Sequence, residues 1–310
     1  MCTLRPLALA AVTVAVAVAG CATRAAAPAA PDARAPRILV VTAVDYEQAA
    51  VRSVLQGPRD GMLGGRAYVL GRASGVEVVA VRAGWGKAHA AGATAAAIQR
   101  FHPSLVVMAG ISGGLDQERA SSGDVVVGSA TFQHDLGLRR AGGDFVPWPP
   151  ETPLERPYPA TRFESPPLLV AAAASAAREV VWSPWMLPHG CACESDGRRK
   201  ATCTGMERRV DREGPRVVAG VLATGDAFLA DPRLAQALAG REGAVSVDME
   251  TAAVAQEAAD HGIPFLGVRV IADMVGGSEG ESLYYCLKPQ SGPRLAAVLA
   301  RILPAVARQL

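Results

Sequence analysis

Short, continuous apolar runs alternate along this chain with longer segments whose apolar residues recur at helical spacing. Apolar runs of about four to eight residues are typical of strands buried on both faces, and a recurrence about every three to four residues is typical of an amphipathic helix. The alternation predicts an α/β fold in three layers (α/β/α), with a mixed sheet covered by helices on both faces. The expected strands lie at residues 38–43, 67–70, 76–81, 105–109, 124–130, 217–223, 244–247 and 264–271, and the expected helices at residues 45–55, 87–101, 168–181, from 232, 249–261 and 295–310.

A single domain is expected to span residues 37–310. The alternating pattern continues through this stretch without an internal repeat and without an interdomain linker. One polar segment, at about residues 182–215, is rich in Pro, Gly and charge and interrupts the pattern. We interpret it as an insertion into the domain.

The N-terminus has the pattern of an export signal. An apolar, Ala-rich run at residues 6–20 follows a basic residue and is too short for a convincing membrane-spanning helix. It ends in a Val-Ala-Gly-Cys sequence that resembles the lipobox of bacterial lipoproteins. We therefore expect removal of residues 1–20 and a lipid anchor on Cys21, with an ordinary signal peptide as the alternative.

Residues 21–36 are rich in Ala, Pro and Arg and show no apolar periodicity, which predicts a flexible tether. The chain is then expected in the cell envelope, anchored to the membrane only through lipid and facing the periplasm. Ala22, after the anchor cysteine, favours the outer membrane.

Four cysteines lie beyond the tether: Cys191, Cys193, Cys203 and Cys286. Export places them in an oxidising compartment, which favours a disulfide clamp in the insertion. Four cysteines allow three pairings that the sequence does not rank. A zinc site and free thiols are the alternatives, although the spacing is not the usual one for zinc, and we expect no metal.

The balance of charge excludes one class of partner. Half of the residues are apolar, 19% are charged, and the formal net charge is +2. Such a balance gives no electrostatic basis for binding nucleic acid or an anionic membrane surface.

Three acids lie where predicted strands end: Glu47, Glu250 and Asp273. In sheets of this kind, ligands bind beyond the carboxyl ends of the strands, so we expect the three to share one site. Cleavage of a glycosidic bond needs such acids, one to grip or polarise the substrate and one to donate a proton.

A glycine-rich segment, Gly-Ile-Ser-Gly-Gly at residues 110–114, also follows a predicted strand. Glycines bring backbone N–H groups close to a ligand, so a ligand-cradling loop is expected here. The spacing matches neither a P-loop nor a dinucleotide fingerprint, and we expect no cofactor.

Each of these features also has a purely structural interpretation. Glu47 could be a surface acid favoured by a helix dipole. Asp45 is the better candidate for the helix N-cap, which leaves Glu47 free to point elsewhere. Asp273 could cap a turn, and the glycines could form a tight turn. An acid such as Glu250 inside an apolar stretch must be paired or functional, because an unpaired buried charge is costly.

Six motifs appear together in one order along the chain, and together they are specific. They resemble the motifs of the purine nucleoside phosphorylase/uridine phosphorylase superfamily, and within it most closely those of the 5′-methylthioadenosine/S-adenosylhomocysteine nucleosidases. The motifs are Ala43-Val-Asp-Tyr-Glu47, Ala83-Gly-Trp-Gly-Lys87, Ala109-Gly-Ile-Ser-Gly-Gly114, Thr224-Gly-Asp-Ala-Phe228, Val247-Asp-Met-Glu250 and Arg269-Val-Ile-Ala-Asp273.

The resemblance implies a partly barrel-like sheet and a role for each acid. Glu47 matches the acid that takes a proton from the attacking water, and Asp273 matches the acid that protonates the purine at N7. Glu250 matches the acid that holds the ribose 2′- and 3′-hydroxyls. The implied reaction is hydrolysis of the N-glycosidic bond of a purine nucleoside, such as methylthioadenosine, to a free base and a ribose derivative.

The remaining contacts are also implied by the resemblance. Met249 packs under the sugar, Phe228 stacks on the base, and the backbone of Leu229 reads the edge of the base. Gly113 and Ile111 are expected to line the substrate site. A homodimer is implied as well, in which Phe132 and His134 reach the pocket of the neighbouring subunit.

Three departures separate the chain from the nucleosidase pattern. Ile111 replaces a residue that usually carries a hydroxyl, and Ala272 replaces a serine beside the catalytic acid. The export signal would place the protein away from cytoplasmic methylthioadenosine. Base preference and the natural nucleoside therefore do not carry over from the family.

Two alternatives stay open at this point. A phosphorylase would need arginines to clamp phosphate, and Arg82 and Arg269 are near enough in sequence to be candidates. A nucleoside-binding or storage protein of the same fold would bind purine without turnover, although it would have no use for all three acids.

Overall fold

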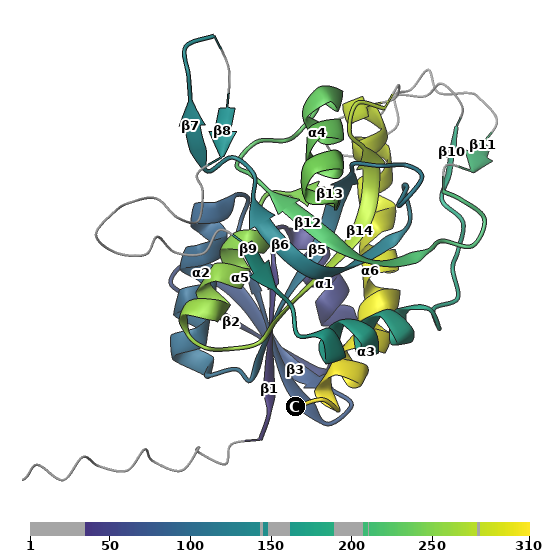
Figure 1. Cartoon of the computed structure of the whole chain (residues 1–310). Coiled ribbons are helices and arrows are strands. Elements are labelled where there is room, and N and C mark those ends of the chain that lie inside the picture. The colour runs from purple at the N-terminus through teal and green to yellow at the C-terminus, as the bar shows by residue number, and fades with distance from the viewer. Residues whose placement is uncertain (1–34, 143–144, 148–161, 189–206, 210, 278–279) are drawn as a thin grey trace, which may run out of the picture. The chain divides into compact units, whose positions relative to one another are not determined.

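The computed structural model of the chain describes residues 35–142, 145–147, 162–188, 207–209, 211–277 and 280–310 (Figure 1). The helices are α1 (Asp45–Ser53), α2 (Lys87–Phe101), α3 (Pro167–Ala177), α4 (Pro232–Glu242), α5 (Thr251–Asp260) and α6 (Gly280–Ala307). The strands are β1 (Arg37–Thr42), β2 (Gln56–Leu63), β3 (Arg66–Ala73), β4 (Val76–Arg82), β5 (Leu105–Gly114), β6 (Val125–Gln133), β7 (Gly137–Arg139), β8 (Phe145–Pro147), β9 (Arg162–Glu164), β10 (Met186–Pro188), β11 (Glu207–Arg209), β12 (Val217–Thr224), β13 (Ala244–Asp248) and β14 (Phe265–Met274).

One mixed sheet organises the chain. Its strands follow the order β13-β12-β6-β14-β5-β1-β4-β3-β2, and β13 also pairs back onto β5. The strands from β13 to β5 therefore close into a barrel-like ring, and β1, β4, β3 and β2 continue from β5 as an open wing. Parallel pairs, such as β1 with β5, coexist with antiparallel pairs, such as β6 with β14. The expected mixed, partly barrel-like sheet is confirmed.

Helices cover both faces of this sheet, as Figure 1 shows. The alternation along β1 illustrates how: Ile38 and Val40 pack with α1, α3 and α6, whereas Leu39 and Val41 pack with α2 and α5. All four side chains are fully buried. Because each such side chain contributes about 1.5–3 kcal/mol, the two-sided core fixes the strands whose ends carry the acids.

Three expectations about the elements need correction. The glycine segment 110–114 is the second half of β5 and not a loop. Strand β2 was not expected, because its sequence combines glycines, a proline and charges; it forms as an edge strand paired with β3. Helix α6 begins at Gly280 and not at 295, since buried Leu287 and Leu295 hold it across internal prolines.

The described part of the Cys-bearing insertion forms a small hairpin, β10 paired with β11. Cys286, on α6, is disulfide-bonded. Cys191, Cys193 and Cys203 lie outside the described residues, as does Cys21, so the disulfide pairing and the lipid anchor stay predictions. Within the described residues, every helix is too short or too polar to cross a bilayer.

Candidate active site

One cleft gathers the carboxyl ends of several strands. It holds about 620 Å³ of empty space, part of which is open solvent. The three predicted acids line it, although they come from distant parts of the chain: Glu47 from α1, Glu250 from the start of α5, and Asp273 from β14. The other lining residues are Ala43, Val44, Tyr46, Trp85, Ile111, Ser112, Gly113, Ala227, Phe228, Leu229, Val247, Asp248, Met249 and Tyr284.

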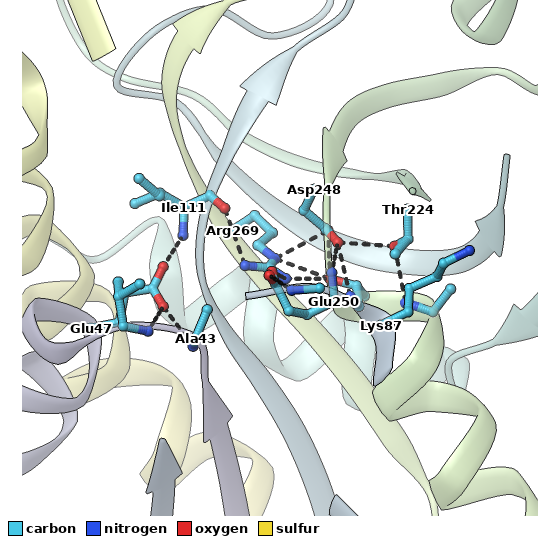
Figure 2. Close-up of polar contacts among 12 residues, drawn as sticks. Ala43, Glu47, Lys87, Ile111, Thr224, Asp248, Glu250 and Arg269 are labelled. Atoms are coloured by element: carbon cyan, nitrogen blue, oxygen red, sulfur yellow. Dashed lines mark hydrogen bonds and ion pairs between the residues drawn. The ribbon is translucent and has the colours of Figure 1, made fainter. Parts of the chain in front are cut away.

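Glu47 is fixed by three backbone N–H groups. Its Oε2 accepts hydrogen bonds from the N–H groups of Ala43 (2.8 Å) and Val44 (3.2 Å), and its Oε1 accepts one from Ile111 (2.9 Å), as Figure 2 shows. Val44, and not Asp45 as expected, is the N-cap of α1. Burial raises the pKa of Glu47, and Arg269 and these N–H groups oppose the rise. Glu47 is therefore a buried carboxyl whose ionised form is held in one orientation.

Close packing of Glu47 and Arg269 against β5 explains why position 110 is a glycine. A Cβ atom at this position would lie 2.5 Å from Glu47 Oε1 and 2.5 Å from Arg269 Nη1. Only a residue without a side chain allows the two groups to approach the strand. The segment is therefore a strand and not the loop that the sequence suggested. Its glycines allow close side-chain packing around β5, and Ile111 and Gly113 line the cleft.

Glu250 belongs to a buried ion-pair network around Arg269 (Figure 2). Its Oε1 accepts a hydrogen bond from the Gly86 N–H (3.0 Å), and its Oε2 lies 3.5 Å from Arg269 Nη2. Asp248 accepts a hydrogen bond from the Glu250 N–H (2.9 Å) and pairs with Arg269 Nε (3.2 Å). Burial raises the pKa of Glu250 to about 7, while Arg269 opposes the rise. The carboxyl is held in the cleft wall, where it can meet paired hydroxyl groups.

Arg269 is already engaged by protein groups and does not line the cleft. Its guanidinium is fully buried and bonds the Thr251 Oγ1 (2.7 Å from Nη2) and the Ile111 carbonyl (3.1 Å from Nη1), besides its two acid partners. The second candidate, Arg82, pairs with Asp45 outside the cleft. Among the described residues that line the cleft there is no Lys, Arg or His.

Asp273 has a different environment from the other two acids. It lies inside β14, next to a register shift after Ile271, and not past the strand end as expected. It is 5% exposed, and no described residue donates a hydrogen bond to its carboxyl. The preceding residue, Ala272, has no hydroxyl to donate. Burial alone raises the pKa of Asp273 to about 7, so a large fraction of this acid is protonated at neutral pH.

Aromatic side chains form the rest of the cleft wall. Phe228 is 51% exposed and meets the Tyr284 ring edge-on at 5.4 Å. The hydroxyls of Tyr46 and Tyr284 lie within hydrogen-bonding reach of each other, and burial raises the pKa of both. Sequence analysis missed both tyrosines. For Tyr46, its position directly before Glu47 was the one sequence signal that it could lie near the cleft.

The match to known families covers nearly the whole domain. A family model described as "Phosphorylase superfamily" matches residues 37–308.

The chain belongs to the phosphorylase superfamily.

Named proteins are similar to this chain over most of their length. A 5′-methylthioadenosine/S-adenosylhomocysteine nucleosidase of Geobacillus kaustophilus is 27% identical over 85% of this chain and 95% of its own. The nucleosidase of the same name from Bacillus cytotoxicus is 27% identical over 77% of this chain and 87% of its own. The expected resemblance is confirmed.

Solved structures of proteins with the same name share the fold. The Colwellia psychrerythraea nucleosidase, in complex with adenine, matches with a TM-score of 0.66 and 24% identity over 89% of this chain and 96% of its own. The Neisseria meningitidis nucleosidase, in complex with methylthio-immucillin-A, matches with a TM-score of 0.64 and 24% identity over 86% of this chain and 98% of its own.

Two predicted residues of this superfamily member lie away from its own cleft. Phe132 is buried in the core beside β13, and the His134 ring packs against Gly225. Their predicted contribution to a neighbouring subunit stays a prediction. No group of His, Cys, Asp or Glu in the described part of the chain is arranged to hold a metal ion.

Proposed function

We propose that this protein hydrolyses the N-glycosidic bond of a purine nucleoside of the methylthioadenosine type. The observation that carries the proposal is the contrast between two acids in one cleft. Glu47 accepts three N–H hydrogen bonds, which stabilise its ionised form, whereas Asp273 is buried and receives no hydrogen bond from the described residues. Burial raises the pKa of both acids, but only Glu47 has hydrogen-bond donors and a cation that oppose the rise. Such a difference in environment between two acids is what acid–base catalysis uses.

Asp273 supplies the leaving-group step. As the bond between C1′ and N9 breaks, its electron pair passes to the purine, and the Asp273 proton passes to N7. The base therefore leaves neutral. Donation by a positioned acid of this kind contributes about 10²- to 10⁴-fold to the rate. The pKa of Asp273, raised to about 7, keeps that proton available at neutral pH.

Glu47 and Glu250 act on the sugar. Water adds to C1′ on the face opposite the base, and Glu47 takes the proton that the water loses. Glu250 accepts hydrogen bonds from the ribose 2′- and 3′-hydroxyls, with Met249 under the ring. The carboxylates also stabilise the positive charge that develops on the sugar ring. Phe228 and Leu229 hold the base at the mouth of the cleft.

Hydrolysis fits this cleft better than phosphorolysis. Phosphate binding needs cationic donors, and the described cleft wall has none, while both candidate arginines are engaged elsewhere. A phosphate beside Glu47 would also meet a negative charge. The names of the relatives are those of nucleosidases, which supports the same choice. The same names favour an enzyme over a protein that binds a nucleoside without turnover.

The test is release of adenine from methylthioadenosine with and without inorganic phosphate. We expect equal rates, with a free reducing sugar as the second product. A rate that requires phosphate, with sugar 1-phosphate visible by ³¹P NMR, would replace this proposal with phosphorolysis. Tight purine binding without any turnover would replace it with a binding protein.

Two further expectations are proposed from the sequence alone. The protein is exported and anchored through lipid on Cys21 at the periplasmic face of the envelope, which radiolabelled palmitate incorporation into the parent but not into Cys21→Ala would support. It also forms a homodimer that brings Phe132 and His134 to the partner's cleft, which sedimentation equilibrium tests.

A further inference from the structure

Helix α6 presents opposite faces to two different parts of the molecule. Residues four apart on a helix share a face, and residues two apart project about 200° from each other. Two rows of three residues therefore lie on opposite sides of its first half: Tyr284, Lys288 and Gly292 in one row, and Cys286, Gln290 and Arg294 in the other. The first row meets the cleft and α1, and the second meets the insertion.

The cleft face of α6 packs against the start of α1. Tyr284 lines the cleft, its ring meets Phe228 edge-on at 5.4 Å, and its hydroxyl lies within hydrogen-bonding reach of Tyr46. On the same face, Lys288 Nζ lies 5.7 Å from the centre of the Tyr46 ring. A Cβ atom at Gly292 would lie 3.3 Å from the Tyr46 carbonyl oxygen. The position of Tyr284 therefore depends on how closely α6 is held against α1.

Arg294 joins the opposite face of α6 to both ends of the insertion. Its guanidinium is buried and lies over the rings of Trp182 (5.3 Å to the centre) and Trp185 (4.4 Å). It donates to the Ser183 carbonyl, near the start of the insertion, and to Asp211 Oδ2 (2.8 Å), near its end. The Asp211 side chain is fully buried and also accepts a hydrogen bond from the Trp185 N–H (3.2 Å). Because either charge would be costly to bury without the other, this pair fixes the insertion on α6.

Two further links lie on the same face of α6. The Gln290 side chain donates to the Met186 carbonyl in β10 (3.4 Å). Cys286 is buried and disulfide-bonded, and every other cysteine of the chain lies outside the described residues. The sequence predicts that its partner is an insertion cysteine. The row that ends at Arg294 would then be tied to the insertion along its whole length.

The first half of α6 needs support from outside the helix. Pro289 and Pro293 each lack the N–H group that a helix uses to bond the carbonyl four residues earlier. Both lie between Tyr284 and Arg294 or beside them, so the helix itself holds Tyr284 less firmly than an uninterrupted helix would. The links to the insertion lie along the same stretch and supply that support.

We propose that the insertion holds α6 against α1 so that Tyr284 stays in the cleft, with Cys286 and Arg294 as the positioning residues, and that reduction of the Cys286 disulfide weakens nucleoside binding. This inference rests on the proposed function, because it concerns the binding step in the same cleft. In the reduction, a dithiol supplies two electrons and two protons, the S–S bond breaks into two thiols, and the dithiol becomes a disulfide.

The consequence of reduction follows from the contacts of Tyr284. Once the disulfide is open, the first half of α6 is free to move away from α1, and Tyr284 no longer supports the Phe228 ring at the proposed base site. The protein would then bind nucleosides tightly only where disulfides persist. The export signal predicts such a compartment for this chain.

Reduction of the folded protein by dithiothreitol is the first arm of the test. The probe is a 5′-methylthio 9-deazaadenosine C-nucleoside, whose carbon–carbon glycosidic bond is not hydrolysed, and isothermal titration calorimetry measures its Kd. We expect the Kd to rise about tenfold or more on reduction, with unchanged far-UV circular dichroism. Cys286→Ser should show the raised Kd without reductant. Ser291→Ala is the matched control, because the Ser291 hydroxyl bonds the Leu287 carbonyl within α6 itself, and it should behave like the parent with and without reductant.

A double-mutant cycle is the second arm and tests whether the support acts through Tyr284. Cys286→Ser should raise the Kd about tenfold in the parent but less than about threefold in Tyr284→Ala, which lacks the side chain being positioned. Arg294→Lys keeps the charge but not the planar group over the two indoles, and should raise the Kd in the same direction. In kinetics, Cys286→Ser should raise KM for methylthioadenosine about tenfold and change kcat less than about threefold.

Three results would overturn the inference. Reduction could leave the Kd unchanged while mass spectrometry shows Cys286 as a free thiol. Cys286→Ser could raise the Kd equally with and without Tyr284, which would show that the disulfide does not act through this residue. Loss of helical signal on reduction would show that the disulfide serves the whole fold and not the cleft. Failure of the protein to release adenine from any nucleoside is a separate outcome: it overturns the proposed function, while binding of the C-nucleoside still tests the role of the insertion.

Discussion

Replacing Asp273 with asparagine is expected to abolish turnover and, at the same time, to stabilise the fold above neutral pH. Burial raises the pKa of this carboxyl from its ordinary value of 3.8 to about 7, and no described residue offsets the burial. At about 1.4 kcal/mol for each tenfold change in proton affinity, the ionised form costs the folded state about 4 kcal/mol. Asparagine has nearly the same shape and no charge to bury.

The sign of the pH dependence follows from linkage. The folded state binds the Asp273 proton more tightly than the unfolded state, so the parent loses stability as pH rises from about 4 to about 7. Asp273→Asn lacks this contribution. The stability difference between the two proteins should be near zero at pH 4 and approach about 4 kcal/mol in favour of the variant at pH 8. Glu250, whose pKa is also raised, is present in both proteins and cancels in the comparison.

Urea unfolding of both proteins at pH 4 and pH 8, with equal m-values, measures the difference. Asp248→Asn is the matched control, because Asp248 is an equally buried aspartate that pairs with Arg269 and accepts four hydrogen bonds. Its loss should destabilise the protein by about 3–5 kcal/mol. Equal stability of the parent and Asp273→Asn at pH 8, or a destabilised variant, would refute the assignment of Asp273 as a buried, neutral acid.

Three other predictions follow from the site. Glu47→Gln should lower kcat by about 10²- to 10⁴-fold with unchanged circular dichroism, and a variant within about threefold of the parent would exclude Glu47 as the base. The kcat of the parent should fall as pH rises through about 7, where Asp273 loses its proton, and a rate that is flat from pH 6 to pH 9 would contradict this. Gly110→Ala should lose activity and stability, because its Cβ meets Glu47 and Arg269 at 2.5 Å. Gly92→Ala in α2, whose Cβ would make only an ordinary contact with Arg66 Nη2 at 3.6 Å, should gain about 0.5–1 kcal/mol; thermal unfolding separates the two.

The elements that the sequence predicts well are those with a buried, regular pattern. Helix α2 begins and ends as expected, at Lys87 and Phe101, because its small residues pack one face against the sheet and His102 closes it in a left-handed conformation. Strand β1 is an uninterrupted apolar run. Strand β2 could not be predicted in this way: its residues are mostly exposed, and pairing with β3, not composition, makes it a strand.

The site was predictable as a set of acids and not as an electrostatic arrangement. The positions of Glu47, Glu250 and Asp273 after apolar strands suggested one shared cleft, and all three line it. That Arg269 is enclosed by Glu250 and Asp248 depends on contacts between β13, α5 and β14 that no local pattern encodes. The same holds for Tyr284, which reaches the cleft from a helix that begins earlier than its prolines suggested.

The most direct test of the proposed mechanism is a crystal structure of the protein with a 5′-methylthio 9-deazaadenosine C-nucleoside. The account predicts Asp273 within hydrogen-bonding distance of N7, Glu250 on the 2′- and 3′-hydroxyls, and Glu47 across the sugar ring from the base with a water molecule between it and C1′. A ligand bound elsewhere, or one bound in the cleft without contact to Asp273, would contradict it.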